Sequence, residues 1–423
     1  MRVCFVSRRY WPAVSGMSAY AENLLRALVR AGHDVTMVSQ YRGDAQGRAV
    51  YGGGPPPPER VPDGVRVVAL EALGEQAVAD GRPADFEADV ATVCRTVLRL
   101  HGETPFDVVH AQYAYPTGLA GLRAAHALGL PAVVSVQGGD GHWVGTCCTT
   151  HRDLVRGVFA GASALLIGSA SFAAEVSDRH GVPTDRWTVV PGATDTDRFV
   201  PAREPGAVGD PPTLLYHGRV DARKGVLDLL DAVRLLRDRA VPVRLVVSGI
   251  GPDTALVDAR VTELGLDDVV EQLGYTDYHA AHEVYRRGDV FVSPTYAEGF
   301  SNTILEAMAT GLPVLSTDVV GVRDCVRDGE NGLLVPPRDP PALADGVQRL
   351  LGRDAEGEDA GDALRHRLAA AALDEVRVRW SWPVVAGLIT DEYERVLAGP
   401  PPPEVPDVPV DPACRFRTAP HLL

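Results

Sequence analysis

The chain has 423 residues, of which 45% are hydrophobic and 23% are charged, so it has the composition of a soluble globular protein of two or three domains. Its formal net charge of −15 argues against nucleic acid as a partner and disfavours stable association with an anionic membrane. Because it shows no apolar stretch of spanning length, no signal-peptide pattern and no C-x2-C spacing among its six cysteines, we expect a cytoplasmic protein with reduced thiols and no metal site.

The first half of the chain alternates strands and helices. A helix is expected over residues 18–31, because its apolar residues recur at helical spacing. Gly16 lies in the loop before it. Apolar runs predict strands at residues 2–7, 34–39, 65–70, 106–110, 131–137 and 164–168. This order is typical of a doubly wound α/β domain with a parallel sheet, whose ligands bind at the carboxyl ends of the strands.

Polar residues follow two of these strands. His110 ends the fourth predicted strand, where it is either a ligand-facing group or a structural histidine. The fifth strand ends at Gln137, which can form hydrogen bonds but cannot take up a proton. Asp140 and His142 then offer polar groups to a hydroxyl-bearing ligand, unless the turn at Asp140 is only structural. Trp143 suits stacking on a sugar or cyclitol face, or packing within the protein.

The second half repeats the alternation. Residues 200–212 contain four prolines and two glycines and are expected to link two domains, 1–199 and 213–379. A last helix is expected at 380–398, followed by a disordered, proline-rich tail at 399–423. Strands are predicted at residues 213–217, 242–248, 269–273, 289–293 and 313–317.

Lys224 is the only lysine of the chain, although lysine and arginine together number 41. The predicted strand 213–217 ends at Gly218, and Arg219 follows. After Lys224, residues 226–236 have the apolar spacing of a helix. A strand, a glycine turn with cations and a helix form a common arrangement for binding a phosphate. The alternative is a surface lysine beside a turn.

Two glutamates flank the start of a second predicted helix. Ser301 or Asn302 is expected to cap the helix, and Gly311 to end it. Glu298 then lies in the preceding loop and Glu306 lies about one turn inside the helix. Backbone N–H groups between them favour an anion. Two carboxylates on either side of an anion site suit a nucleotide sugar, which has hydroxyls at both ends and phosphates between them.

These motifs, taken in order, resemble family 4 glycosyltransferases, which are retaining enzymes of the GT-B fold. The resemblance rests on Glu298 and Glu306 after Gly218-Arg219 and Lys224-Gly225, and on further matches such as residues 32–35, 106–110, 134–140, 190–199 and 329–335. It spans about residues 1–398. It implies two Rossmann-like domains facing a central cleft, the first holding the acceptor and the second the donor, with the last helix crossing back to the first domain.

The resemblance implies a transferase that moves a hexosyl or N-acetylhexosaminyl group from a nucleoside-diphosphate sugar, with UDP as the expected nucleotide and no other cofactor. Lys224 and Arg219 would stabilise the departing phosphate in place of a metal ion, and Glu298 would contact the donor sugar. The expected catalytic residues are Lys224, Arg219, Glu298, Asp140 and His110. The expected donor-binding residues are Gly16, Gly218, Gly299, Phe300, Ser301, Asn302, Thr303 and Glu306. The expected acceptor-binding residues are Gln137, His142 and Trp143.

The acceptor is expected to be a small soluble molecule, such as an aminocyclitol or another natural-product aglycone, since cations are drawn to an acidic surface. The preference for arginine indicates a GC-rich genome, as in actinobacteria, where such enzymes modify antibiotics. An anionic acceptor of a thiol or phosphosugar route, bound by Arg8 and Arg9, is the alternative. A sugar-nucleotide epimerase and a non-catalytic sugar-nucleotide binder are the other hypotheses. A monomer or a homodimer is expected.

Overall fold

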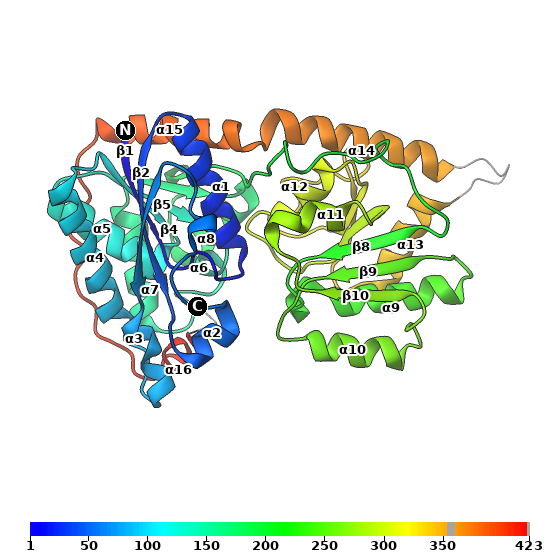
Figure 1. The fold of residues 1–423 in the computed structure, drawn as a ribbon, viewed down its shortest axis with the longest axis horizontal. Coiled ribbons are helices and arrows are strands. Elements are labelled where there is room, and N and C mark those ends of the chain that lie inside the picture. The colour runs from blue at the N-terminus through cyan, green and yellow to red at the C-terminus, as the bar shows by residue number, and fades with distance from the viewer. Residues whose placement is uncertain (353–359, 421–423) are drawn as a thin grey trace. The chain divides into compact units, whose positions relative to one another are not determined.

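The computed structural model describes residues 1–352 and 360–420, which form two compact units (Figure 1). The N-terminal unit comprises Met1–Pro191 and Trp382–Leu423, and the C-terminal unit comprises Gly192–Ser381. Residues 353–359 of the expected second domain and 421–423 of the expected tail lie outside the described residues.

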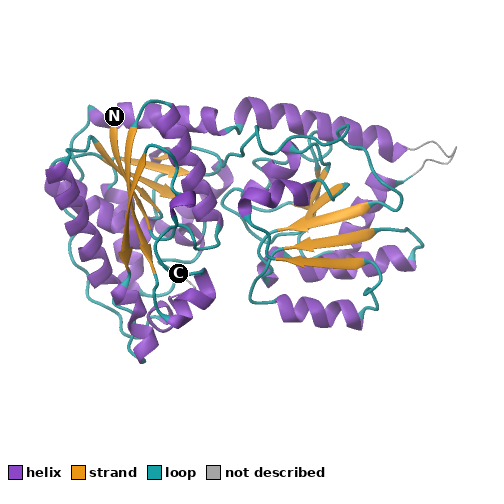
Figure 2. Cartoon of the chain, in the orientation of Figure 1, coloured by secondary structure: helices purple, strands orange, loops and turns teal. Residues whose placement is uncertain are grey.

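The N-terminal unit is built on a seven-stranded parallel sheet in the order β3-β2-β1-β4-β5-β6-β7. Helices lie on both faces of this sheet (Figure 2). The strands are β1 (Arg2–Ser7), β2 (Asp34–Tyr41), β3 (Val65–Glu71), β4 (Val108–Gln112), β5 (Ala132–Val136), β6 (Ala164–Ile167) and β7 (Trp187–Val189). The helices are α1 (Gly16–Arg30), α2 (Ala45–Tyr51), α3 (Leu73–Gln76), α4 (Phe86–Glu103), α5 (Leu119–Leu128), α6 (Gly139–His142), α7 (Thr149–Gly161), α8 (Ala170–His180), α15 (Trp382–Leu397) and α16 (Arg415–Thr418).

The C-terminal segment belongs to the N-terminal unit. Helix α15 packs against α1, where the rings of Tyr20 and Trp382 lie 5.2 Å apart. The chain beyond α15 then follows the surface of the same unit, with Arg123 bonded to Asp407 at 2.6 Å and Phe416 fully buried. The expectation of a disordered tail is therefore wrong for the described residues, because the proline-rich segment carries apolar and polar anchors that it buries.

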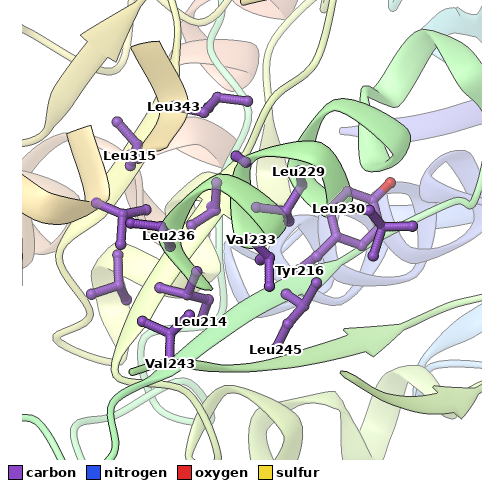
Figure 3. Packing of buried hydrophobic residues seen from close by; sticks show 14 of the residues in the cluster. Leu214, Tyr216, Leu229, Leu230, Val233, Leu236, Val243, Leu245, Leu315 and Leu343 are labelled. Atoms are coloured by element: carbon purple, nitrogen blue, oxygen red, sulfur yellow. The ribbon is translucent and has the colours of Figure 1, made fainter. Parts of the chain in front are cut away.

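The C-terminal unit has a six-stranded parallel sheet in the order β10-β9-β8-β11-β12-β13. Its strands are β8 (Thr213–His217), β9 (Arg244–Ser248), β10 (Val270–Gly274), β11 (Val290–Ser293), β12 (Val314–Thr317) and β13 (Leu333–Val335). Its helices are α9 (Val226–Asp238), α10 (Thr254–Glu263), α11 (Ala281–Tyr285), α12 (Asn302–Ala309), α13 (Pro340–Leu351) and α14 (Ala360–Arg379). Figure 3 shows α9 packed on the sheet through Leu229, Leu230 and Val233, which are almost fully buried.

The sequence predicts the strands well and the domain boundary less well. Every predicted strand is present within two residues of its expected bounds, while β7 and β13, of three residues each, are additional. The division between the units falls at Pro191 rather than at the predicted linker 200–212. The linker segment is held in the C-terminal unit by Arg365, whose Nε donates to the carbonyl of Gly206 at 3.1 Å.

Candidate active site

The candidate donor site lies where the strand order of the C-terminal sheet reverses, between β8 and β11. Ligands of doubly wound sheets bind at this position. The loops that follow the two strands are in contact, because Tyr296 N donates to Arg223 O at 2.9 Å. Gly225 makes this approach possible: its φ is +70°, and a Cβ there would lie 2.0 Å from Pro294 O.

Lys224 and Glu298 form an ion pair across these loops, with 2.6 Å between Nζ and Oε1. Their side chains are 31% and 16% exposed, so both can reach a ligand. Arg219 is more exposed, at 58%, and its Nε lies 3.5 Å from Asp221. The structure thus brings together Lys224 and Glu298, with Arg219 on the same loop as Lys224, and the roles of all three in catalysis stay predictions.

Helix α12 begins beside this ion pair. Ser301 is its N-cap, as one of the two sequence alternatives has it, and in the described part of the chain its side chain makes no capping hydrogen bond. An anion is favoured at this end of a helix by the N–H groups and the helix dipole. Gly321 lets the loop at Glu298 pack closely, since a Cβ there would lie 2.3 Å from Glu298 O. Phe300 stacks edge-on against Trp380 at 6.0 Å.

Glu306 lies inside α12 and is almost fully buried, with 7% of its surface exposed. The Tyr285 hydroxyl donates to its Oε2 at 2.6 Å. Burial raises the pKa of Glu306 to about 7, although the Tyr285 hydrogen bond and the charge of Arg198 oppose the shift. Glu306 therefore changes charge close to neutral pH in the ligand-free unit.

This shift predicts a pH dependence of donor binding. We expect Glu306 to bind the ribose hydroxyls of the donor. A carboxylate can accept hydrogen bonds at both oxygens, whereas the acid has one oxygen that donates. Binding should thus favour the ionised form, and UDP affinity should fall as the pH drops through about 7. Titrations of UDP from pH 5.5 to 8.5 would measure this, with Glu306→Gln as the control for the ionisation of UDP. If the variant shows the same pH dependence as the wild type, the role of Glu306 is wrong.

The N-terminal unit has its own reversal of strand order, between β1 and β4. A chain of hydrogen bonds crosses it: Ser7 Oγ donates to Gln112 Oε1 at 2.7 Å, and Gln112 Nε2 donates to Gln137 Oε1 at 2.8 Å. Gly16 begins α1, and among the described residues a Cβ at this position would meet no atom within 4 Å outside its chain neighbours and the backbone of its own helix. Gln112 on β4, itself bonded to Ser7 on β1, thus orients the side chain of Gln137.

His110 is not where the sequence places it. It lies in the middle of β4 rather than at its end and is fully buried. Its ring nitrogens are hydrogen bonded to the Tyr393 hydroxyl at 2.6 Å and to Ser135 Oγ at 2.7 Å. Burial lowers the pKa of His110 to about 3, so the ring is neutral. The predicted catalytic assignment is corrected: His110 joins β4 to β5 and α15, because β4 runs two residues beyond the predicted strand end.

Asp140 is fully buried and holds the turn that follows β5. Its Oδ1 accepts from the N–H groups of Gln137 and Gly138, both at 3.0 Å, and its Oδ2 accepts from Ala114 N at 2.8 Å. Burial raises the pKa of Asp140 to about 6 in spite of these bonds. The contacts indicate that Asp140 positions Gln137, and they favour the structural interpretation of the turn over direct participation in the chemistry.

We therefore expect Asp140→Asn to act mainly on stability. An amide nitrogen in place of one carboxylate oxygen would face a backbone N–H, and such a buried mismatch costs about 1–3 kcal/mol. Thermal unfolding should show a clear fall in melting temperature, while turnover of the folded fraction should change by less than about tenfold. A loss of turnover of about 100-fold or more with unchanged melting would place Asp140 at the chemistry instead.

His142 and Trp143 form an aromatic group at the end of α6. Their rings stack with centroids 5.8 Å apart, and His142 also contacts Phe172 at 4.5 Å. His142 Nδ1 is hydrogen bonded to Glu175 at 2.9 Å, which orients the ring. Their assignment to acceptor binding stays a prediction.

Tyr285 and Asp221 contact predicted site residues, Glu306 and Arg219, although neither was expected from the sequence. Tyr285 is fully buried and donates to Glu306. Asp221 pairs with Arg223 at 2.7 Å and with Arg219, and the Arg223 hydrogen bond, with burial opposing it, holds the pKa of Asp221 at about 2. The alternation of charges in residues 219–224 was the available signal for Asp221, whereas no local pattern marks Tyr285.

Comparison with known families defines the class of protein. Residues 15–193 match the model of the glycosyl transferase 4-like domain, and residues 211–353 match the glycosyl transferases group 1 model. The fold is similar to that of sucrose-phosphate synthase from Thermosynechococcus elongatus, with a TM-score of 0.73 and 23% identity over 94% of this chain and 99% of that chain. It is also similar to Anabaena HepE in complex with UDP-glucose, with a TM-score of 0.71 and 17% identity over 93% of this chain and all of that one. The two family models and the similar folds thus identify the two units of this chain as glycosyltransferase domains of the GT-B fold.

Curated relatives agree with this class. A D-inositol 3-phosphate glycosyltransferase from Xylanimonas cellulosilytica is 30% identical over 89% of this chain and 91% of its own length, and one from Geodermatophilus obscurus is 32% identical over 80% and 78%. A glycogen synthase from Mycobacterium tuberculosis is 27% identical over 96% of this chain and 98% of its own. The chain belongs to the family 4 glycosyltransferases of the GT-B fold and is a transferase. None of its described helices is both long enough and apolar enough to span a membrane.

Proposed function

We propose that this enzyme transfers a hexosyl or N-acetylhexosaminyl group, with retention of anomeric configuration, from a nucleoside-diphosphate sugar to a small soluble acceptor such as an aminocyclitol. UDP is the proposed nucleotide. The proposal rests above all on the Lys224–Glu298 ion pair. This pair lies beside the start of α12, where the order of strands in the sheet reverses between β8 and β11. That arrangement offers a point charge and helix N–H groups to phosphates, and carboxylates to the hydroxyls on either side.

In the proposed reaction, the bond between the anomeric carbon and the diphosphate breaks as negative charge builds up on the leaving phosphate oxygen. Lys224 and Arg219 stabilise that charge, and the start of α12 adds its dipole. Glu298 holds the sugar hydroxyls, and Glu306 with Tyr285 holds the ribose. The departing phosphate takes the acceptor proton on the same face, so no side-chain base is required.

The charges of the N-terminal unit support a neutral or cationic acceptor over a phosphorylated one. Arg8 and Arg9, the cations considered for an anionic acceptor, are 4% and 5% exposed and both pair with the buried Glu75. Burial opposes ionisation of Glu75, yet these arginines hold its pKa at about 2. Both guanidinium groups are thus buried and bonded within the protein, so neither is presented at the surface to an anionic acceptor. The net charge of −15 favours the approach of a cation.

Release of nucleoside diphosphate from a panel of UDP-, GDP- and ADP-sugars, with and without acceptor, tests the proposal. We expect release from a UDP-sugar that rises with an aminocyclitol and not with D-inositol 3-phosphate. The anomeric coupling constant in the product's proton NMR spectrum should match that of the donor. Stimulation by D-inositol 3-phosphate alone would contradict the acceptor class. Conversion of the donor without release would indicate an epimerase, and binding without any reaction would indicate a non-catalytic protein.

Leaving-group stabilisation by side chains predicts that transfer does not need Mg²⁺ or Mn²⁺. Initial rates should be equal in buffer passed over a chelating resin and in the same buffer with millimolar Mg²⁺ or Mn²⁺ added, because Lys224 and Arg219 supply the positive charge. Activity that appears only with the added ion would overturn the metal-independent mechanism.

A further inference from the structure

Three cysteines and a histidine of the N-terminal unit meet at one point. His151 Nδ1 lies 3.1 Å from Cys147 Sγ, 3.4 Å from Cys148 Sγ and 3.3 Å from Cys414 Sγ. The two neighbouring sulfurs are 3.9 Å apart, and all four atoms lie within 4.8 Å of one another. Cys414 reaches the cluster from a position 263 residues further along the chain.

Hydrogen bonding among neutral groups accounts for only part of this convergence, because the weak bond between the thiols of Cys147 and Cys148 still leaves three sulfurs around one imidazole nitrogen. An imidazole nitrogen takes part in one good hydrogen bond, and a thiol is a weak donor, so at most one of the three sulfurs can be satisfied by Nδ1. A single cation at the centre would satisfy all four atoms. Tetrahedral zinc with bonds of about 2.3 Å to sulfur and 2.0–2.1 Å to nitrogen requires sulfur–sulfur separations of about 3.8 Å. The sulfur atoms of Cys147 and Cys148 are 3.9 Å apart, and the other sulfur–sulfur separations are at most 4.8 Å. These separations differ from the tetrahedral value by about 1 Å or less.

The surroundings resemble those of a closed structural site. His151 is fully buried among aromatic rings, with Tyr115 at 4.6 Å, Phe416 at 5.9 Å and Phe86 at 6.1 Å. Three thiolates and one zinc ion leave a net charge of −1, which the nearby buried Arg417, itself bonded to Glu87 at 2.8 Å, helps to balance.

The backbone around the cluster is fixed without any ion. Cys148 caps the start of α7, and its Sγ accepts from His151 N at 3.4 Å. Thr150 holds the incoming C-terminal segment: its Oγ1 donates to Pro409 O at 2.5 Å and accepts from Asp411 N at 2.8 Å. These hydrogen bonds hold the backbone on both sides of the cluster in place, so the four side chains are positioned for a metal ion.

We propose that Cys147, Cys148, His151 and Cys414 bind one structural zinc ion that fastens the C-terminal segment to the start of α7. Sulfur-rich sets of four ligands with no open position select zinc among the common divalent ions. The ion would also fix the far end of the loop that begins at Trp143, just after His142 ends α6, because Cys147 and Cys148 end that loop. The role is structural and lies apart from the metal-independent leaving-group chemistry proposed above.

Metal analysis of the full chain, purified reduced from zinc-supplemented culture, tests this. We expect about one zinc per chain, released when the wild type is titrated with an organomercurial thiol reagent. Replacing the ion with Co²⁺ should give the intense visible absorption of a tetrahedral cobalt thiolate. Cys414→Ser should lose the zinc and melt at a lower temperature, whereas Cys94→Ser, a thiol on α4 outside the cluster, should keep it.

Wild-type measurements alone can overturn the proposal, so it does not depend on how the variants fold. Reduced wild type that holds no zinc and gives no cobalt thiolate absorption would contradict it. So would a disulfide between any two of the three cluster cysteines, detected by alkylation and mass spectrometry of freshly purified protein. Equal zinc loss in Cys94→Ser and Cys414→Ser would show that the ion does not reside at the cluster.

Discussion

Lys224→Ala should reduce release of nucleoside diphosphate by about 100-fold or more, since it removes one preorganised charge from the leaving phosphate. The structure supports this prediction, because Lys224 Nζ lies 2.6 Å from Oε1 of Glu298, on the loop that leads into α12. Initial rates at saturating donor would measure the effect. Lys224→Arg should also be impaired, because a planar guanidinium does not replace a compact ammonium group.

Arg237→Ala provides the matched control for lost positive charge. Arg237 lies on α9 of the same unit and pairs with Asp268 at the surface. Its loss should leave the rate within about twofold, as for surface substitutions generally. Near-normal turnover in Lys224→Ala, with unfolding temperatures like those of the control, would show that Lys224 does not contact the leaving group.

Glu298→Gln and Glu306→Gln should differ in kind. Glu298 contacts Lys224 and is expected to hold the sugar near the breaking bond, so its amide variant should lose turnover by about 10-fold or more. Glu306 is expected to hold the ribose, whose contacts act equally in the ground and transition states, so its variant should mainly raise the KM of the donor. Full kinetics with varied donor would separate the two effects. Equal changes confined to KM in both variants would contradict this division of roles.

The positions of the proposed donor-binding residues could be predicted from sequence because local signals mark them. Gly218, Lys224, Glu298 and Glu306 follow strands whose apolar runs are unambiguous, and parallel strands bring their carboxyl ends to one edge of the sheet. The cap at Ser301 and the stop at Gly311, where φ is +74°, follow from rules of helix termini.

The remaining features depend on contacts between distant residues. His110 was misplaced because β4 extends two residues past its predicted end, which turns a strand-end histidine into a buried one. The cluster at His151 has no C-x2-C signature, since the proposed ligands are adjacent cysteines, a histidine three positions after Cys148 and a thiol from the C-terminal segment. The packing of that segment was missed because its proline and acidic content is typical of disorder.

Titration of UDP into the wild type and Lys224→Ala by calorimetry tests the central claim most directly, since it requires no knowledge of the acceptor. Losing a hydrogen bond to a charged group costs about 1.5–3 kcal/mol, so UDP should bind the variant about 10- to 150-fold more weakly than the wild type. Arg237→Ala should bind it like the wild type. Equal affinity of Lys224→Ala and the wild type for UDP, or no binding of any nucleoside diphosphate by the wild type, would contradict a donor site at the strand reversal of the C-terminal unit.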